Sequence, residues 1–263
     1  MKISIVTATY NSAATVRNTI ESVLGQSYGD FEHIIVDGLS KDDTVAICRS
    51  YEERYGGRLR IISERDRGIY DAMNKGVRLA TGDVVGILNS DDMLSDETVL
   101  ELIAKAINGT PGNEADCVYG DLVFVDAADT SRVVRTWKGS QHTKGGFLKG
   151  WHPAHPTFYA RRELFSRLGG FDTTFNVSAD FELMLRFIEK GEARNRYIPH
   201  TLVKMRMGGE STGSIKSIIE GNRNVLRAFE KNGLKVPPFY LVRRLAPKAW
   251  NMVLCKLGMA SKG

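Results

Sequence analysis

The chain is 263 residues long, 42% hydrophobic and 25% charged with a formal net charge of +5, an ordinary globular composition for one large domain or one domain and an appendage. Its three cysteines, Cys48, Cys117 and Cys255, are far apart and form no C-x-x-C pair, which argues against a disulfide framework or a zinc ribbon. No apolar run approaches the roughly 20 residues of a membrane-spanning helix, so we expect a cytosolic protein that is at most peripheral to a membrane.

Strand-like and helix-like segments alternate along the first third of the chain. The apolar N-terminal stretch is the first strand; it turns polar by Thr7 and is too short for a signal peptide. In the helix that follows, Asn11 or Ser12 is the expected N-cap, and Gly25 lies near the C-terminus. The predicted strands are 2–8, 32–37, 59–64 and 83–88, and the predicted helices between them are 12–27, 42–55 and 69–80. Four such repeats predict an α/β fold with a parallel sheet and helices on both faces.

Polar residues follow each predicted strand, at the edge of the sheet where open α/β proteins bind ligands. The segments are TATYN after the first strand, DGLSKDD after the second, ERDRG after the third and NSDD after the fourth. The topology therefore predicts that Asp37, Asp66, Asp91 and Asp92 meet at one binding edge, outside the core.

The adjacent acids Asp91 and Asp92 are the most specific feature of this edge. Helix capping is the alternative explanation for acids here, and it suits Asp96 and Glu97, which belong to a helix predicted from Ser95. Crowded carboxylates raise each other's pKa unless a cation compensates, so the edge indicates Mg²⁺ or Mn²⁺ completed by substrate phosphates. The two commonest phosphate-binding glycine motifs are missing, which leaves metal-bridged diphosphate binding.

Four segments in order carry a family resemblance. They are VTATYNSAATVRNTIESVLGQ, IIVDGLSKDDT, ERDRGIYDAMNKGVRLATGDVVGILNSDD and GGFDTTFNVSADFELMLRF. Together they resemble the family 2 inverting glycosyltransferases of the GT-A fold, particularly bacterial enzymes that build surface polysaccharides. The resemblance covers about residues 2–211 and implies an open, mostly parallel sheet with helices on both faces. We therefore expect a GT-A domain over 1–212 and a basic, helical C-terminal appendage over 213–263.

The resemblance also implies an activity and a set of binding residues. It implies metal-dependent transfer of one sugar, with inversion, from a nucleotide-diphosphate donor, expected to be a UDP-sugar, to a hydroxyl of a growing, lipid-linked bacterial glycan. The residues expected to bind the nucleotide are Thr9, Tyr10, Asp37, Asp66 and Asp91. The family's aspartate-x-aspartate motif falls on NSDD with Asn89 at its first position, so Asp91 and Asp92 are the expected metal-binding pair. Asp92 is the expected direct ligand of Mg²⁺ or Mn²⁺.

The segment NVSADFELMLRF is predicted to be a helix with Ser178 as its N-cap. Inversion is a single displacement, so an acceptor hydroxyl must lose a proton as it attacks the anomeric carbon. The resemblance assigns this general-base role to Asp180, with Glu182 as the next candidate and as a possible contact for the donor or the acceptor. The alternative is that both acids only interact favourably with the helix dipole.

Two histidines, His152 and His155, lie in the segment KGWHPAHPTFYARREL. Nearby prolines and the spacing argue against a dedicated zinc site. The resemblance places this segment beside the donor diphosphate and the acceptor, with His155 the better candidate for contact.

The basic character of the chain is confined to its C-terminus. From Lys231 onward there are seven basic residues and no acid, whereas the preceding 230 residues hold 29 basic and 31 acidic groups. An amphipathic helix over 213–231 is expected to pack on the domain. Residues 238–263 mix aromatic and basic side chains, which is typical of a helix lying on an anionic membrane surface at the inner face of the cell membrane. A solvated or oligomerising helix is the alternative, and nucleic acid is not an expected partner because it leaves the acidic edge unexplained.

Two other functions remain open at this stage. Nucleotidyl transfer to a sugar phosphate uses a related fold, but it normally has a Gly- and Arg-rich loop after the first strand, where this chain has ATYNSAATVR. A non-catalytic sugar-nucleotide-binding protein is the other alternative. The sequence identifies neither the sugar nor the acceptor, because such specificity depends on pocket shape.

Overall fold

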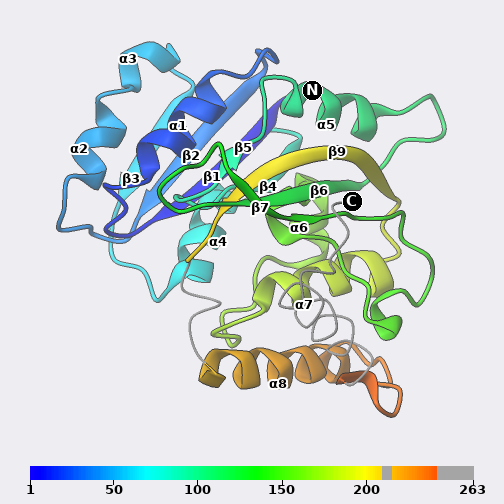
Figure 1. The fold of residues 1–263 in the computed structure, drawn as a ribbon. Helices are drawn as coiled ribbons and strands as arrows, with labels where there is room; N and C mark the ends of the chain where they lie inside the picture. The colour runs from blue at the N-terminus through cyan, green and yellow to red at the C-terminus, as the bar shows by residue number, and fades with distance from the viewer. Residues whose placement is uncertain (209–214, 242–263) are drawn as a thin grey trace.

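The computed structural model describes residues 1–208 and 215–241, and its centre is a nine-stranded mixed sheet with the order β3-β2-β1-β4-β8-β6-β9-β5, in which β7 pairs with β6 (Figure 1). The first half of the sheet consists of β1 (Ile3–Thr9), β2 (Phe31–Asp37), β3 (Leu59–Ser63) and β4 (Val84–Ile87). These four strands are parallel to one another, which confirms the predicted repeats. β1 and β4 are buried along their whole length, as the unbroken apolar runs of a parallel sheet require.

The second half of the sheet introduces antiparallel pairing. It contains β5 (Met93–Leu94), β6 (Cys117–Val125), β7 (Val133–Trp137), β8 (Tyr159–Arg161) and β9 (Asn195–Arg206). β8 joins the two halves, because it runs antiparallel to both β4 and β6. β6 and β9 are parallel, while β5 runs antiparallel to β9. The α/β class is confirmed, and the sheet is mixed because its C-terminal strands return in both directions.

Helices cover both faces of the sheet, as predicted, and each face has its own apolar core. One face carries α1 (Val16–Leu24), α2 (Thr44–Arg49), α3 (Glu52–Tyr55) and α5 (Val99–Asn108), which lie together above the sheet in Figure 1. The predicted helix 42–55 is broken in two. The Ser50 hydroxyl donates a hydrogen bond of 2.6 Å to the backbone carbonyl of Ile47. Such a local side-chain bond competes with the backbone hydrogen bonds that would continue the helix.

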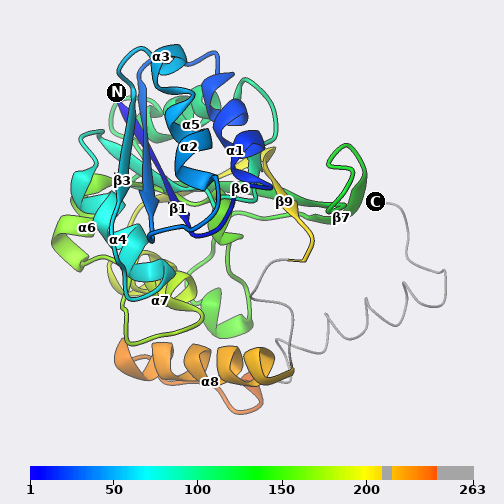
Figure 2. The same ribbon diagram turned by 90° about the vertical axis from the view of Figure 1, so that its left-hand side faces the viewer.

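The other face carries α4 (Ile69–Leu79), α6 (Arg162–Leu168), α7 (Ala179–Leu185) and α8 (Ile215–Lys231). The short helical turns are η1 (Phe147–Lys149), η2 (His155–Thr157) and the π-helical η3 (Arg186–Lys190). Figure 2 shows α8 alongside α7, on the side of the molecule away from α1 to α3. The ring of Phe229 on α8 meets that of Phe181 at a centroid distance of 5.8 Å, so the amphipathic helix is packed on the domain as expected.

The C-terminal segment is described only as far as residue 241. Tyr240 is buried and its ring packs edge-on against Phe229 at 5.0 Å, so the chain just beyond the two prolines still contacts the domain. Most of the predicted membrane-binding stretch, 242–263, lies outside the described residues. Among the residues that are described, no helix has the length and apolarity needed to cross a bilayer.

Candidate functional site

The carboxyl ends of β1, β2 and β3 and the loop after β2 are joined by hydrogen bonds around the carboxylate of Asp37. It accepts hydrogen bonds from the Thr9 hydroxyl (3.1 Å), the Ser40 backbone N–H (3.0 Å) and the Ser63 hydroxyl (2.6 Å), and also from the Ser40 hydroxyl. Asp37 is almost fully buried. Thr9 and Asp37 therefore face each other inside the edge, where they fix its shape.

Tyr10 is the predicted nucleotide-binding residue that the structure leaves most open, with 60% of its surface exposed. It lies beside Asp66 across Gly38. A Cβ built on Gly38 would be 2.5 Å from Asp66 Oδ2 and 3.5 Å from Tyr10 Cδ2. Only glycine permits this close approach. The structure thus brings Tyr10 and Asp66 together at the rim of the edge.

The loop after β4 joins the same edge through a contact of 2.9 Å between the hydroxyls of Ser90 and Ser12. Asp91 is partly buried here. Asp92 is 0% exposed, and its oxygens accept hydrogen bonds from Asn89 Nδ2 (3.0 Å) and from the Arg206 backbone N–H (3.2 Å). Burial and the neighbouring charge of Asp91 raise the pKa of Asp92 to about 8.

This geometry corrects the expected position of Asp92, which was outside the core. Its carboxyl has no exposed surface and accepts a hydrogen bond from the protein at each oxygen, so in this structure it is closed to solvent. Within the described part of the chain, no cluster of three or more His, Cys, Asp and Glu side chains could enclose a metal ion. One accessible carboxylate with a second beside it still fits Mg²⁺ or Mn²⁺, because these ions use few protein ligands when substrate phosphates complete their shell.

The carboxylate of Asp180 lies at the start of α7 and has a different environment. Its side chain is 25% exposed; Oδ2 lies 3.3 Å from His155 Nδ1, and Oδ1 accepts a hydrogen bond of 3.3 Å from the Tyr70 hydroxyl. Asp180 and His155 line a small cavity together with Val85 and Ile87 of β4, the strand that leads to Asp91. Ser178 is the N-cap of α7 as predicted, with a left-handed backbone (φ 69°) and no hydrogen bond from its side chain to the helix.

Glu182 does not join this cluster. It is 1% exposed, and Arg186 binds both of its oxygens at 2.9 Å. Asn232, just after α8, donates a further hydrogen bond of 3.0 Å to Glu182. The predicted donor or acceptor contact of Glu182 is therefore corrected: its carboxylate holds α7 to α8 and is closed to a substrate.

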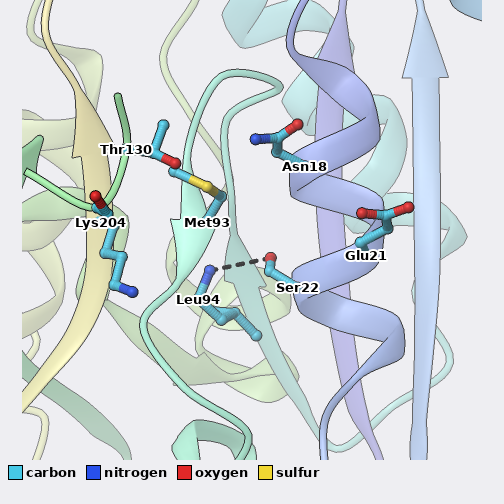
Figure 3. A pocket seen from close by; sticks show the side chains of 8 residues that line it. Asn18, Glu21, Ser22, Met93, Leu94, Thr130 and Lys204 are labelled. Atoms are coloured by element: carbon cyan, nitrogen blue, oxygen red, sulfur yellow. Dashed lines mark hydrogen bonds between the residues drawn. The ribbon is translucent and has the colours of Figure 1, made fainter. Parts of the chain in front are cut away.

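A groove of about 330 Å³ lies between α1, β5 and β9 (Figure 3). Its lining residues are Asn18, Glu21, Ser22, Met93, Leu94, Thr130, Ser131 and Lys204. A hydrogen bond of 3.1 Å from the Leu94 backbone N–H to the Ser22 hydroxyl closes one side. None of the predicted site residues lines the groove, although it begins at Met93, next to Asp92. Open α/β sheets bind ligands beyond the carboxyl ends of their strands, and the size of this groove alone does not make it a binding site.

Sequence reasoning did not identify Tyr70 and Arg206. Tyr70 lies inside the motif ERDRGIYDAMNKG, yet nothing in the sequence links it to a residue 110 positions later. Arg206 is the last residue of β9, and its backbone N–H donates a hydrogen bond to Asp92. Its positive charge lowers the pKa of Asp92, but burial raises that pKa by more. Both contacts depend on the tertiary fold.

Comparison with known proteins identifies the family of this chain. The sequence matches glycosyl transferase family 2 over residues 4–176. A PGL/p-HBAD biosynthesis glycosyltransferase of Mycobacterium tuberculosis is 32% identical over 200 residues, which is 76% of this chain and 74% of that protein. The putative glycosyltransferase EpsE of Bacillus subtilis is 27% identical over 208 residues, 78% of this chain and 73% of EpsE.

Two solved structures share the fold. Residues 1–349 of S. aureus TarS superpose with a TM-score of 0.69 at 18% identity, over 94% of this chain and 72% of that one. The TarS fragment has also been solved with UDP-GlcNAc. The mannosyltransferase PcManGT from Pyrobaculum calidifontis, in complex with GDP-Man and Mn²⁺, gives a TM-score of 0.62 at 22% identity, over 92% of this chain and 67% of the other.

Proposed function

The chain belongs to glycosyl transferase family 2, and on that premise we propose that it is a metal-dependent inverting enzyme of polysaccharide biosynthesis. It moves one sugar from a UDP-sugar to a hydroxyl of a growing, lipid-linked bacterial glycan. The observation that carries the proposal is the partly exposed carboxylate of Asp180, held by Tyr70 and His155 in a cavity shared with β4, the strand that leads to Asp91.

The donor nucleotide is assigned to the edge formed by the first three loops. The exposed ring of Tyr10 offers an aromatic face to the base, and Asp66 lies beside it as an acceptor for ribose or base hydrogens. Thr9 and Asp37 support this surface from beneath through their mutual hydrogen bond. Solved relatives of the same fold hold a uridine donor in TarS and a guanosine donor in PcManGT, so the test must include both.

The metal is assigned to Asp91, which differs from the expectation that Asp92 is the direct ligand. Asp91 is the more exposed of the two carboxylates, whereas Asp92 holds the side chain of Asn89 and the end of β9. A bound Mg²⁺ or Mn²⁺ would neutralise negative charge on the departing diphosphate. In support, PcManGT was solved with Mn²⁺.

Asp180 is assigned as the general base. It would take the proton of the acceptor hydroxyl as the oxygen attacks the anomeric carbon opposite the diphosphate, forming the new glycosidic bond and breaking the old one in a single displacement. His155, 3.3 Å from Oδ2, orients the carboxylate. Family membership favours sugar transfer over nucleotidyl transfer.

A panel of nucleotide sugars tests the proposal. Thermal unfolding and hydrolysis are measured with UDP- and GDP-sugars, each with Mn²⁺, Mg²⁺ or a chelator. We expect at least one UDP-sugar to raise the melting temperature and to be hydrolysed only when metal is present. Stabilisation by GDP-sugars alone would replace the uridine assignment, and no response to any nucleotide sugar would overturn the function.

The basic tail is proposed to bind an anionic membrane surface, which would place the enzyme beside a lipid-linked acceptor. A chain ending at Leu241 keeps Tyr240 packed on Phe229 and removes only residues 242–263. We expect the full chain, and not the shortened one, to sediment with anionic vesicles in a salt-sensitive manner. Equal sedimentation of the two proteins would show that the tail has another role.

A further inference from the structure

Tyr70 faces the carboxylate of Asp180 from the opposite helix. Its hydroxyl donates to Asp180 Oδ1 at 3.3 Å, and its ring stacks on that of Phe171 with centroids 5.8 Å apart and planes at 19°. We propose that Tyr70 is a positioning residue for the sugar-transfer reaction, whose hydroxyl fixes the orientation and the charge of Asp180. This inference rests on the proposed role of Asp180 as general base.

The two oxygens of Asp180 have different partners, so the hydrogen bond from Tyr70 occupies only one of them. Oδ1 is occupied by Tyr70 from α4, while Oδ2 faces His155 from η2. With Oδ1 fixed, Oδ2 is the oxygen left to accept a proton, on the side where His155 lies. Tyr70 and His155 are the titratable groups that the structure sets against this carboxylate.

Tyr70 keeps its proton in this environment. Burial raises the pKa of its phenol, and the charge of Asp180 raises it further, while the backbone N–H groups of Ala179 and Ser178 act in the opposite direction. The hydroxyl is therefore a donor throughout the working pH range. A donor to an ionised carboxylate favours the charged form and so keeps the base ready to accept a proton.

A second residue on the same face of α4 supports the arrangement. Asn74 lies one turn after Tyr70, and its amide makes two hydrogen bonds to the backbone of Phe171, at 2.7 Å to the carbonyl and 2.8 Å from the N–H. A Cβ on Gly170 would meet Asn74 Oδ1 at 2.3 Å, so the backbone approaches α4 closely here. α4 thus holds both ends of the segment that leads from Phe171 to Asp180.

The same helix also reaches the donor edge. Gly68 is the N-cap of α4, and its backbone N–H donates a hydrogen bond of 2.9 Å to Asp66. Tyr70 is the second residue of the same helix. One rigid element therefore fixes the distance between the proposed nucleotide edge and the proposed base. Correct placement of reacting groups is a large part of catalysis, and small displacements are costly.

The test is Tyr70→Phe, which keeps the stacked ring and removes the hydroxyl. With donor and metal saturating, we expect kcat to fall about 10- to 100-fold, the size expected for losing a hydrogen bond to a charged group. The acidic limb of the pH profile of kcat should move to higher pH, because Asp180 loses a donor that favours its charged form. The donor Kd should stay unchanged.

Tyr51→Phe is the matched control, because the Tyr51 hydroxyl also donates to a carboxylate, that of Glu21, at 2.6 Å and away from the site. Its kcat and pH profile should match those of the parent protein. A second variant guards against misfolding: 3-fluorotyrosine at position 70 keeps ring and hydroxyl but makes the hydroxyl a stronger donor, so the acidic limb should move to lower pH.

The outcomes separate this inference from the proposed function. If Asp180→Asn retains turnover, the base assignment fails and the role of Tyr70 fails with it. If Asp180→Asn is inactive while Tyr70→Phe keeps the parent kcat and acidic limb, only the inference is overturned. The inference is also overturned if kcat falls in both position-70 variants while the acidic limb of the pH profile stays in place. Such a result would mean that Tyr70 acts only through packing.

Discussion

Asp92 and Asp180 are both carboxylates at the end or beginning of a regular element, yet the fold treats them in opposite ways. Asp92 is fully buried, and its oxygens accept hydrogen bonds from Asn89 in the same loop and from Arg206 at the end of β9. Asp180 keeps a quarter of its surface open and makes two longer contacts of 3.3 Å. Asp37 resembles Asp92, and Asp91 is intermediate. Carboxylates that hold loops together are thereby distinguished from those that remain available for chemistry.

The largest effect on activity is expected at Asp180, the more exposed of the two carboxylates. Asp180→Asn should lower kcat by about 10² to 10⁴, since the amide matches the carboxylate in shape but accepts no proton. Donor affinity should be unchanged in calorimetry with nucleotide diphosphate and Mn²⁺. Asp43→Asn, an exposed position at the start of α2, is the control and should leave kcat unaltered. Near-normal transfer by Asp180→Asn would remove it from the reaction.

Asp91 and Asp92 provide the closest test, because they are adjacent and differ mainly in burial. Asp91→Asn should abolish metal-dependent donor binding with little change in the free energy of unfolding. Asp92→Ala should lower that free energy by about 1–3 kcal/mol, because it leaves donors from Asn89 and Arg206 unpaired in the interior.

Denaturant unfolding and calorimetry on the same two variants decide between these roles. Burial and the charge of Asp91 raise the pKa of Asp92 to about 8, which favours its protonated form in the fold, so its removal relieves less buried charge than removal of an ionised carboxylate would. A stable Asp92→Ala protein that has lost its metal response would restore Asp92 as the direct ligand.

Tyr10 represents the exposed rim of the donor edge. Tyr10→Ala should weaken nucleotide binding by about 1–3 kcal/mol, the usual value of stacking between a base and an aromatic ring. The melting temperature should stay within error, because the ring is 60% exposed and packs little. Tyr10→Phe is the matched control and should bind as the parent does. Unchanged affinity after Tyr10→Ala would place the base elsewhere along the edge.

The sequence predicts the parts of this molecule that depend on local pattern. The runs KISIVTA and DVVGIL are buried strands because they are apolar throughout, and polar residues must follow them where the strands leave the core. That reasoning locates the edge. The buried acids also have partners far along the chain: Arg206 lies 114 positions from Asp92, and Asn232 lies 50 from Glu182. No periodicity or spacing encodes such contacts, so burial of Asp92 and Glu182 was not predictable.

The smallest predicted effect concerns a buried polar group in the core of the sheet. His33 is fully buried between Thr7 and Tyr55, with its ring nitrogens 2.9 Å and 2.8 Å from their hydroxyls. The Tyr55 hydroxyl donates its own hydrogen bond to the Ile20 carbonyl, so it must act as the acceptor toward His33. His33 is therefore a neutral ring that carries its proton on Nδ1 and donates it to Tyr55 in a hydrogen bond. Burial lowers the pKa of His33 from 6.5 to about 3.

This shift has a definite sign for stability. Below pH 6.5 the unfolded chain takes up a proton that folded His33 refuses until about pH 3, so acidification favours unfolding by up to about 1.4 kcal/mol per pH unit. We expect His33→Gln to be less stable than the parent at pH 7.5, because its amide fits the two hydroxyls less well, and to lose less stability between pH 6.5 and 5. Glu32 also titrates differently in the folded chain. Burial raises its pKa, but hydrogen bonds, above all the one from Ser4, lower it to about 2. The window from pH 6.5 to 5 lies above the pKa of Glu32 in the unfolded chain, so Glu32 contributes little to the comparison. Urea unfolding of both proteins at several pH values gives the difference directly. Parallel curves would mean that His33 takes up its proton equally in the folded and the unfolded chain, which would contradict a buried, neutral ring.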